Sequence, residues 1–142
     1  MAHNPAGAAF LARQLALRQP GRRFVAVLGM LADKDAEGVV NALQHCVRHW
    51  VCTGTRGPRG QGAAALRDRL PVTVSTGLAA DARQALEQAR SLCGPRDAIL
   101  AFGSFDLVEQ VRNSLSEMHA PIAVAVGPRP EGAGAPASGG CG

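Results

Sequence analysis

Short apolar runs alternate with segments of helical periodicity along most of this 142-residue chain. The continuous runs at 24–28 and 98–102 predict strands buried on both faces, and shorter runs at 50–52 and 72–74 predict two more strands. Strands that alternate with helices are typical of an α/β domain. We therefore expect three layers, with helices on both faces of a mostly parallel sheet.

Five segments place their apolar residues at helical spacing, and they cover residues 4–19, 35–47, 63–70, 78–92 and 105–118. Asn4 followed by Pro5 is a helix-start signal, because Asn caps free amides and Pro suits the first helical position. Asp35 is a candidate cap for the second helix, which Gly38 weakens slightly. We expect that helix to carry Val39, Val40, Leu43 and Val47.

The C-terminal part of the chain has a different composition. Residues 121–126 could form an edge strand, whereas from Gly127 onward the chain is Gly, Pro, Ala and Ser with almost no core-forming residue. We expect a folded domain at residues 1–120 and a disordered tail at 121–142.

The composition is that of a compact domain, with 46% hydrophobic and 18% charged residues. No apolar run approaches the roughly 20 residues of a membrane helix, and the start of the chain does not read as a signal peptide. The cytoplasm is therefore the expected location. The four cysteines show no metal-ligand spacing, so we interpret them as reduced thiols at apolar positions: Cys46, Cys52, Cys93 and Cys141.

The net charge of +4 arises from 15 basic and 11 acidic residues. The arginines are dispersed and Tyr is absent, which disfavours nucleic acid as a partner. An anionic small molecule accounts for a mild basic excess equally well.

Four short motifs combine polar side chains with helix starts or glycine-rich turns. They are Ala2-His3-Asn4-Pro5, Gly29-Met30-Leu31-Ala32-Asp33-Lys34-Asp35, Gly57-Pro58-Arg59-Gly60 and Gly103-Ser104-Phe105. The second and fourth each follow a predicted strand and lead into a predicted helix. Polar groups at the carboxyl ends of parallel strands mark the ligand crevice of an open α/β sheet.

In their order and in their residues, these motifs resemble those of the C-terminal domain of the bifunctional dihydrofolate synthase/folylpolyglutamate synthase, a member of the Mur ligase superfamily. The resemblance covers roughly residues 2–118. It implies a Rossmann-like Mur ligase C-terminal fold and an ATP-dependent ligase that forms an amide bond. In that reaction ATP converts the carboxylate of dihydropteroate or a folate to an acyl phosphate, which the amino group of L-glutamate attacks.

The chain departs from the family pattern at its start. The family places an Asp two residues before the Ala-His pair, after a strand, and carries an N-terminal domain with a phosphate loop and magnesium ligands. No G-x-x-x-x-G-K-[ST] motif occurs in these 142 residues. We therefore expect a sheet truncated at its N-terminal strand, prone to self-association through the exposed edge. We also expect an inactive fragment that binds neither ATP nor magnesium alone and meets folate only through the missing domain. The alternative is a non-catalytic α/β binding module.

The resemblance assigns Lys34 and Ser104 to glutamate binding and His3 and Asn4 to nucleotide binding. A parallel sheet would bring these groups to its carboxyl edge. Each also has a plainer interpretation. Lys34 could pair with Asp33 or Asp35, Ser104 and Asn4 could be simple helix caps, and His3 a frayed terminal residue.

Two further pairs are weaker candidates. Arg56 and Arg59 frame a Gly-Pro loop and could meet an anion, although solvated loop arginines are commoner. His45 and His49 stand four residues apart, a helical spacing that can bind metal, but no third ligand is evident. We interpret both histidines as ordinary helix residues and predict no metal site.

Overall fold

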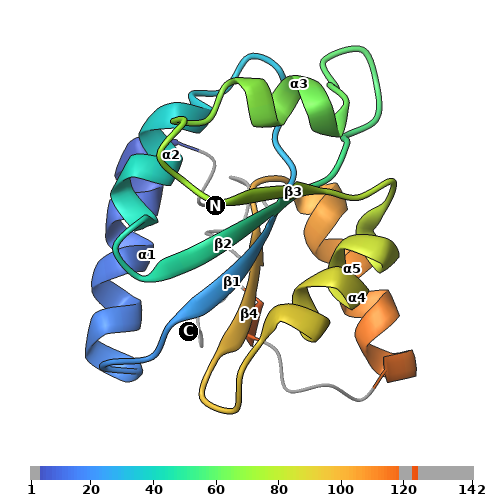
Figure 1. Ribbon diagram of the computed structural model, residues 1–142. Coiled ribbons are helices and arrows are strands. Elements are labelled where there is room, and N and C mark those ends of the chain that lie inside the picture. Colours follow the sequence, from blue (N-terminus) through green and yellow to red (C-terminus); the bar gives the residue numbers. More distant parts are fainter. Residues whose placement is uncertain (1–3, 119–122, 125–142) are drawn as a thin grey trace, which may run out of the picture.

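A computed structural model describes residues 4–118 and 123–124 (Figure 1). Its helices are α1 (Pro5–Arg18), α2 (Ala36–Leu43), α3 (Ala63–Asp68), α4 (Ala82–Leu92) and α5 (Phe105–Met118). Its strands are β1 (Phe24–Leu28), β2 (Val47–Cys52), β3 (Thr76–Leu78), β4 (Ala98–Phe102) and β5 (Ala123–Val124). The strands form one sheet in the order β3-β2-β1-β4-β5, and every pairing is parallel.

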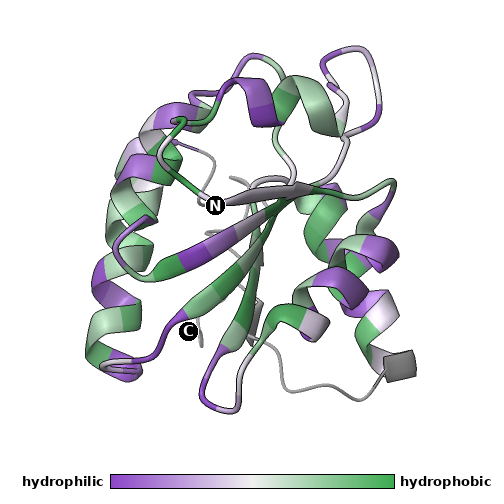
Figure 2. Ribbon diagram, viewed as in Figure 1, coloured by the Kyte–Doolittle hydropathy of each residue, from purple (hydrophilic) through white to green (hydrophobic). Residues whose placement is uncertain are grey.

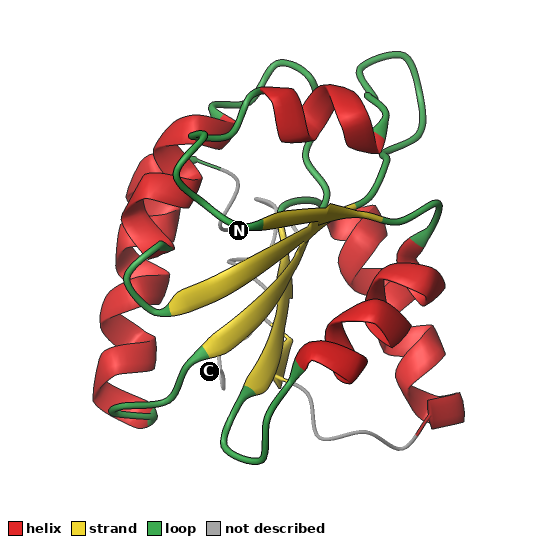
Figure 3. Ribbon diagram, viewed as in Figure 1, coloured by secondary structure: helices red, strands yellow, loops and turns green. Residues whose placement is uncertain are grey.

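The sheet lies between two helical layers, as the alternating pattern predicted (Figure 3). Strand β1 shows why, because all five of its residues are buried and they alternate between two cores. Phe24, Ala26 and Leu28 pack with α1, α2 and α3. Val25 and Val27 pack with α4 and α5 on the other face. Strands β1 and β4 are accordingly hydrophobic along their length, whereas β2 has a hydrophilic stretch near its start that contains Arg48 and His49 (Figure 2).

The second helix is shorter than predicted, and the prediction that Val47 lies on it is wrong. Helix α2 ends at Leu43, and a turn follows in which the Cys46 amide donates to the Leu43 carbonyl at 3.0 Å. Val47 then begins β2 and pairs with Phe24 of β1. A β-branched residue suits a buried strand as well as a helix face, so the apolar spacing alone misplaced the boundary.

The predicted strand at 72–74 is also wrong. These residues form a turn in which the Val74 amide donates to the Pro71 carbonyl at 3.2 Å, and Val72 is fully exposed. The third strand is β3, which pairs with Trp50–Cys52 and includes Leu78, a residue we expected in the next helix. Helix α4 begins only after Asp81, whose carboxylate accepts from the Gln84 amide.

At the other side of the sheet, β5 pairs with Leu100 and Ala101 of β4. It lies within the edge strand predicted at 121–126, whose remaining residues, like the predicted tail from 127, fall outside the described part of the chain. None of the helices in that described part is long and apolar enough to cross a membrane.

Candidate functional site at the carboxyl edge of the sheet

The order of the strands creates a switch point between β1 and β4. From β1 the chain moves to β2 and β3 on one side, and it returns through α4 to β4 on the other side. Leu28, the last residue of β1, is in register with Phe102, the last residue of β4. Ligands of open α/β sheets bind in the crevice outside the carboxyl ends of strands at such a point.

Glycines at the ends of both strands let the two backbones approach closely. Gly103 adopts a φ of 118°, which side chains disfavour. A Cβ atom at this position would lie 2.3 Å from the Gly29 carbonyl oxygen. The Gly-Met-Leu and Gly-Ser-Phe motifs therefore begin in direct contact, and they place Lys34 and Ser104 on loops that leave the same edge.

The loop from Gly29 to Asp35 holds Lys34 between two carboxylates that are engaged by other groups. Asp33 accepts from the Arg59 guanidinium at 2.8 Å, and Asp35 caps α2 by accepting from the Gly38 amide at 2.9 Å. Among the described residues, no ion pair involves the half-buried Lys34, the only lysine of the chain. The interpretation that Lys34 pairs with an acidic neighbour is therefore wrong.

The following loop, residues 53–62, is fastened to the Lys34 loop by several hydrogen bonds. The Thr55 hydroxyl and the Gln61 side-chain amide both donate to the Met30 carbonyl, at 3.2 and 2.9 Å. The Ala32 amide donates to the Arg59 carbonyl at 2.7 Å. The Gly-Pro-Arg-Gly motif therefore acts in this structure as part of the wall that fixes the shape of the Lys34 loop.

Arg69, which follows α3, is a positioning residue that the sequence analysis missed. Its guanidinium donates to the Ala32 carbonyl at 3.0 Å and to the Lys34 carbonyl. Both acceptors are backbone groups of the Lys34 loop. No sequence signal identifies such a residue, because the acceptors are carbonyls some 35 positions away in the chain.

Ser104 immediately precedes α5 and is half-buried at the crevice. Its hydroxyl accepts from the Leu107 amide at 3.1 Å, and its carbonyl accepts from the Val108 amide. The capping interpretation is therefore confirmed. The serine hydroxyl and the positive end of the helix dipole also provide donors for a carboxylate, so capping leaves a binding role open.

Arg56 and Arg59 both form ion pairs while they remain largely exposed to solvent. Arg56 donates to both oxygens of Asp106, from Nε at 3.2 Å and from Nη2 at 2.7 Å. The hydrogen bond from Arg56 is the largest cause that holds the pKa of the Asp106 carboxyl below its usual value. Arg56 thereby joins the 53–62 loop to the first turn of α5.

The N-terminal motif is described from Asn4 onward. The Asn4 side chain accepts from the Gly7 amide at 2.7 Å, which confirms it as the cap of α1. Pro5 lies against Gly38, where a Cβ would come within 2.6 Å of the proline ring. The start of α1 therefore lies beside the start of α2, near the Lys34 loop. His3 falls outside the described residues.

The prediction that His45 and His49 share a helix is wrong. His45 lies in the turn after α2, and His49 is in β2. The Nδ1 atom of His49 lies 2.7 Å from the Ser75 hydroxyl, and burial followed by the charge of Arg48 lowers the pKa of this histidine. No group of three or more acidic, histidine or cysteine side chains suited to a metal occurs among the described residues.

Three of the four cysteines are described, and all three are free thiols. Burial raises the pKa of the Cys52 thiol to about 11, and it also raises the pKa values of Cys46 and Cys93. All three pack against the hydrophobic cores. The prediction of reduced thiols at apolar positions is confirmed for them, and Cys141 lies outside the described residues.

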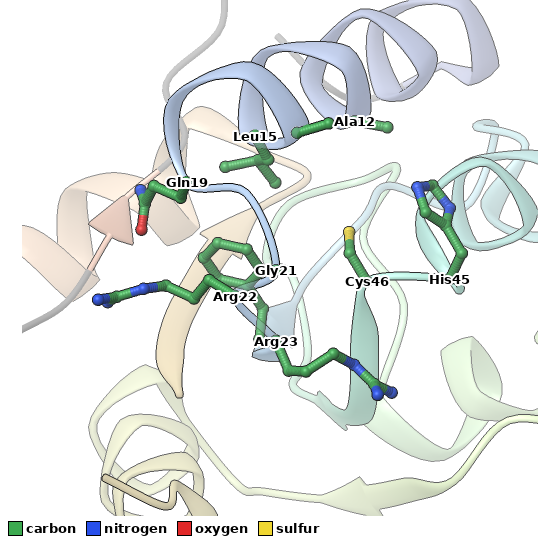
Figure 4. Close-up of a pocket in the computed structure, with 10 residues that line it drawn as sticks. Ala12, Leu15, Gln19, Gly21, Arg22, Arg23, His45 and Cys46 are labelled. Carbon is green, nitrogen blue, oxygen red and sulfur yellow. The ribbon is translucent and has the colours of Figure 1, made fainter. Parts of the chain in front are cut away.

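A cavity of about 200 Å³ lies at the opposite, amino edge of the sheet (Figure 4). Its lining is largely apolar and includes Leu15 and Phe24. Arg22 and Arg23 also border it, but Figure 4 shows their guanidinium groups extending away in different directions. The polar groups of the motifs gather at the carboxyl edge, and that edge is the candidate site.

Comparison with known proteins decides the family. The sequence profile of the Mur ligase, glutamate ligase domain matches residues 1–105. The chain belongs to the Mur ligase family. A dihydrofolate synthase/folylpolyglutamate synthase from Escherichia coli (strain K12) is 35% identical to this Mur ligase domain over 112 residues. That match covers 78% of the chain but 26% of the relative, so the chain spans about a quarter of the length of the curated relatives.

Solved structures agree on the fold of this Mur ligase domain. E. coli FolC in complex with ADP superposes with a TM-score of 0.73 at 31% identity, over 84% of this chain and 28% of that chain. A bifunctional folylpolyglutamate synthase/dihydrofolate synthase with Mn, AMPPNP and L-glutamate bound gives a TM-score of 0.64 at 33% identity, over 83% and 27%. The α/β fold expected from the sequence is therefore confirmed.

Proposed function

We propose that this Mur ligase domain holds L-glutamate for an ATP-dependent ligase that adds glutamate to dihydropteroate or folates through an acyl phosphate. The curated relatives carry both activities in their names, and one similar structure contains L-glutamate. The domain would present the amino acid, and its cytoplasmic location follows from the same proposal.

The observation that carries the proposal is that Lys34 and Ser104 leave the same carboxyl edge of the sheet, at the β1–β4 switch point where Gly29 and Gly103 approach closely. Glutamate has two carboxylates. Lys34 offers an ammonium group that no described acidic residue neutralises, and Ser104 offers a hydroxyl at a helix N-terminus. One carboxylate would bind each group, which leaves the amino group of glutamate free to attack an activated carboxyl carbon.

The nucleotide and its metal would be held mainly by other parts of the complete ligase. The 142 residues contain no phosphate-loop motif, and the described residues contain no carboxylate cluster for magnesium. We propose that His3 and Asn4 face the nucleotide, because Asn4 caps α1 and the adjacent Pro5 lies against Gly38 at the start of α2. Folate or dihydropteroate would likewise contact a domain N-terminal to this one.

Calorimetric titration of the 142-residue chain with L-glutamate tests the glutamate site. Lys34→Ala removes a charge-assisted contact of about 1.5–3 kcal/mol, so affinity should fall roughly 10-fold or more. Arg48→Gln is the matched control, because it removes one positive charge and an ion pair with Asp97 at the amino edge. Equal affinity of the wild-type chain and Lys34→Ala, or no binding by the wild-type chain, would favour the non-catalytic module.

We also propose that the 142 residues alone form no glutamyl amide, because they lack the groups that hold the ATP phosphates. A phosphate-release assay with ATP, glutamate and dihydropteroate or tetrahydrofolate measures this. Release that depends on the acceptor, from the pure chain, would contradict the proposal.

A further inference from the structure

Two oppositely charged side chains meet beside Ser104. Arg56 contributes both Nε and Nη2 to the two carboxylate oxygens of Asp106, and Gln110 donates a third hydrogen bond to the same carboxylate at 2.8 Å. Asp106 is in the first turn of α5, two residues after Ser104. Arg56 reaches it from the 53–62 loop, 50 positions away in the chain.

The place of Asp106 conflicts with a glutamate site on the same turn. The Ser104 side chain and carbonyl satisfy the amides of Leu107 and Val108. The amides of Phe105 and Asp106 have no partner within the helix, and they are the donors that a carboxylate would meet. An Asp106 carboxylate without a counter-charge would repel that ligand from the same turn. Its lowered pKa means that it remains ionised at neutral pH.

We propose that Arg56 is a positioning residue for glutamate, because it neutralises Asp106 and keeps the N-terminus of α5 open to a carboxylate. This inference rests on the glutamate site proposed above. Arg56 does not itself touch the substrate. It acts through Asp106, which it also holds away from the first-turn amides by a two-point contact.

A purely structural role for the ion pair is poorly supported by its surroundings. The Arg56 and Asp106 side chains are 75% and 47% exposed, and pairs this exposed contribute little to folding stability. The 53–62 loop is already fastened by Thr55, Arg59 and Gln61 to the Lys34 loop. Loss of Arg56 should therefore change the charge at α5 without releasing the loop.

Single and double substitutions separate the two roles by the sign of their effects. We expect Arg56→Gln to weaken L-glutamate binding to the 142-residue chain by about three- to tenfold at low salt. Two unit charges a few ångströms apart in a water-like dielectric have an effect of this size, and Asp106 is about half exposed. Asp106→Asn should bind glutamate at least as tightly as the wild-type chain. The double variant Arg56→Gln/Asp106→Asn should return to within about twofold of the wild-type affinity, and added salt should reduce the differences.

Each outcome bears on a specific claim. If the pair is only a structural tie, both single variants weaken binding and the double variant stays weak, which overturns the inference. Unchanged affinity in Arg56→Gln, with loss in Lys34→Ala, also overturns it and leaves the proposed function standing. Absence of glutamate binding by the wild-type chain overturns both. Arg48→Gln, with an intact site and the same change in net charge, should bind like the wild-type chain.

Discussion

At the scale of single residues, the site depends on which charges are already neutralised. Lys34 stands between two acidic residues, yet one of them pairs with Arg59 and the other caps α2. The Asp106 carboxylate in the first turn of α5 is neutralised by Arg56. The crevice therefore keeps one uncompensated ammonium group and a helix N-terminus, which is a suitable arrangement for a dicarboxylate.

The contact between Gly29 and Gly103 can be tested by adding one methyl group. Gly103→Ala should destabilise the fold by about 3 kcal/mol or more, because the new Cβ meets the Gly29 carbonyl and the φ of 118° is strained. Gly57→Ala is the control. Its φ is 90°, but no atom lies within 4 Å of the added Cβ, so only the backbone strain of about 1–2 kcal/mol applies.

Urea unfolding of the two variants gives both free energies of unfolding. If Gly103→Ala and Gly57→Ala lower the free energy of unfolding equally, the close approach of the ends of β1 and β4 is contradicted.

Among the helices and strands, the sequence correctly predicted the ones whose apolar pattern has only one interpretation. Strands β1 and β4 are continuous apolar runs, and α1 begins with an Asn-Pro cap, so their bounds were predicted closely. The boundary between α2 and β2 was missed because Val47 fits either pattern. Strand β3 was missed because its Thr-Gly-Leu sequence has weak strand propensity and is defined by pairing with β2.

For the candidate site, the sequence predicted the residues that belong to motifs but not the contacts between distant parts of the chain. Lys34, Ser104 and Asn4 belong to motifs, so the sequence alone named them. The sequence could not identify Arg69 as a positioning residue or name the partners of Arg56 and Arg59. These contacts join positions 26 to 50 residues apart, and they depend on the order of the strands in the sheet.

Asp97 joins the start of β2 to the turn before β4. We expect the contribution of this connection to folding stability to depend on pH. Its carboxylate accepts from the Gly94 amide at 2.8 Å and from the Arg48 guanidinium at 3.0 Å. The Gly94 hydrogen bond is the largest cause that lowers the pKa of Asp97. Because the pKa is lower in the folded state, the stabilisation is complete above the ordinary value near 3.8 and is lost as pH falls below it.

Unfolding free energies measured from pH 7 to pH 2.5 test this connection. Asp97→Asn should lose about 1 kcal/mol at pH 7 and show a shallower decline below pH 4 than the wild-type chain. Parallel pH profiles for the two proteins would contradict the role given to Asp97.

At the scale of the whole molecule, the described surface has features that favour association. On α1, Phe10 and Leu17 lie seven positions apart and are 56% and 76% exposed. Exposed apolar side chains on one face of a helix promote contacts between molecules.

Sedimentation velocity over a range of concentrations should therefore show reversible self-association of the 142-residue chain. Phe10→Ser combined with Leu17→Ser should reduce it. Val72→Ser is the control, because Val72 is a single exposed apolar residue in a turn. A monomer at every concentration, with a sharp unfolding transition, would contradict this expectation.

In the proposed site, Lys34 and the start of α5 bind the same glutamate molecule. Because Lys34 is the only lysine, reductive 13C-dimethylation gives one lysine resonance, and 15N labelling reports the amides of Ser104–Leu107. We predict that titration with L-glutamate shifts both sets of signals with one dissociation constant, while the amide of Arg48 at the amino edge stays unchanged. Different constants for the two reporters, or a response confined to one of them, would contradict the claim.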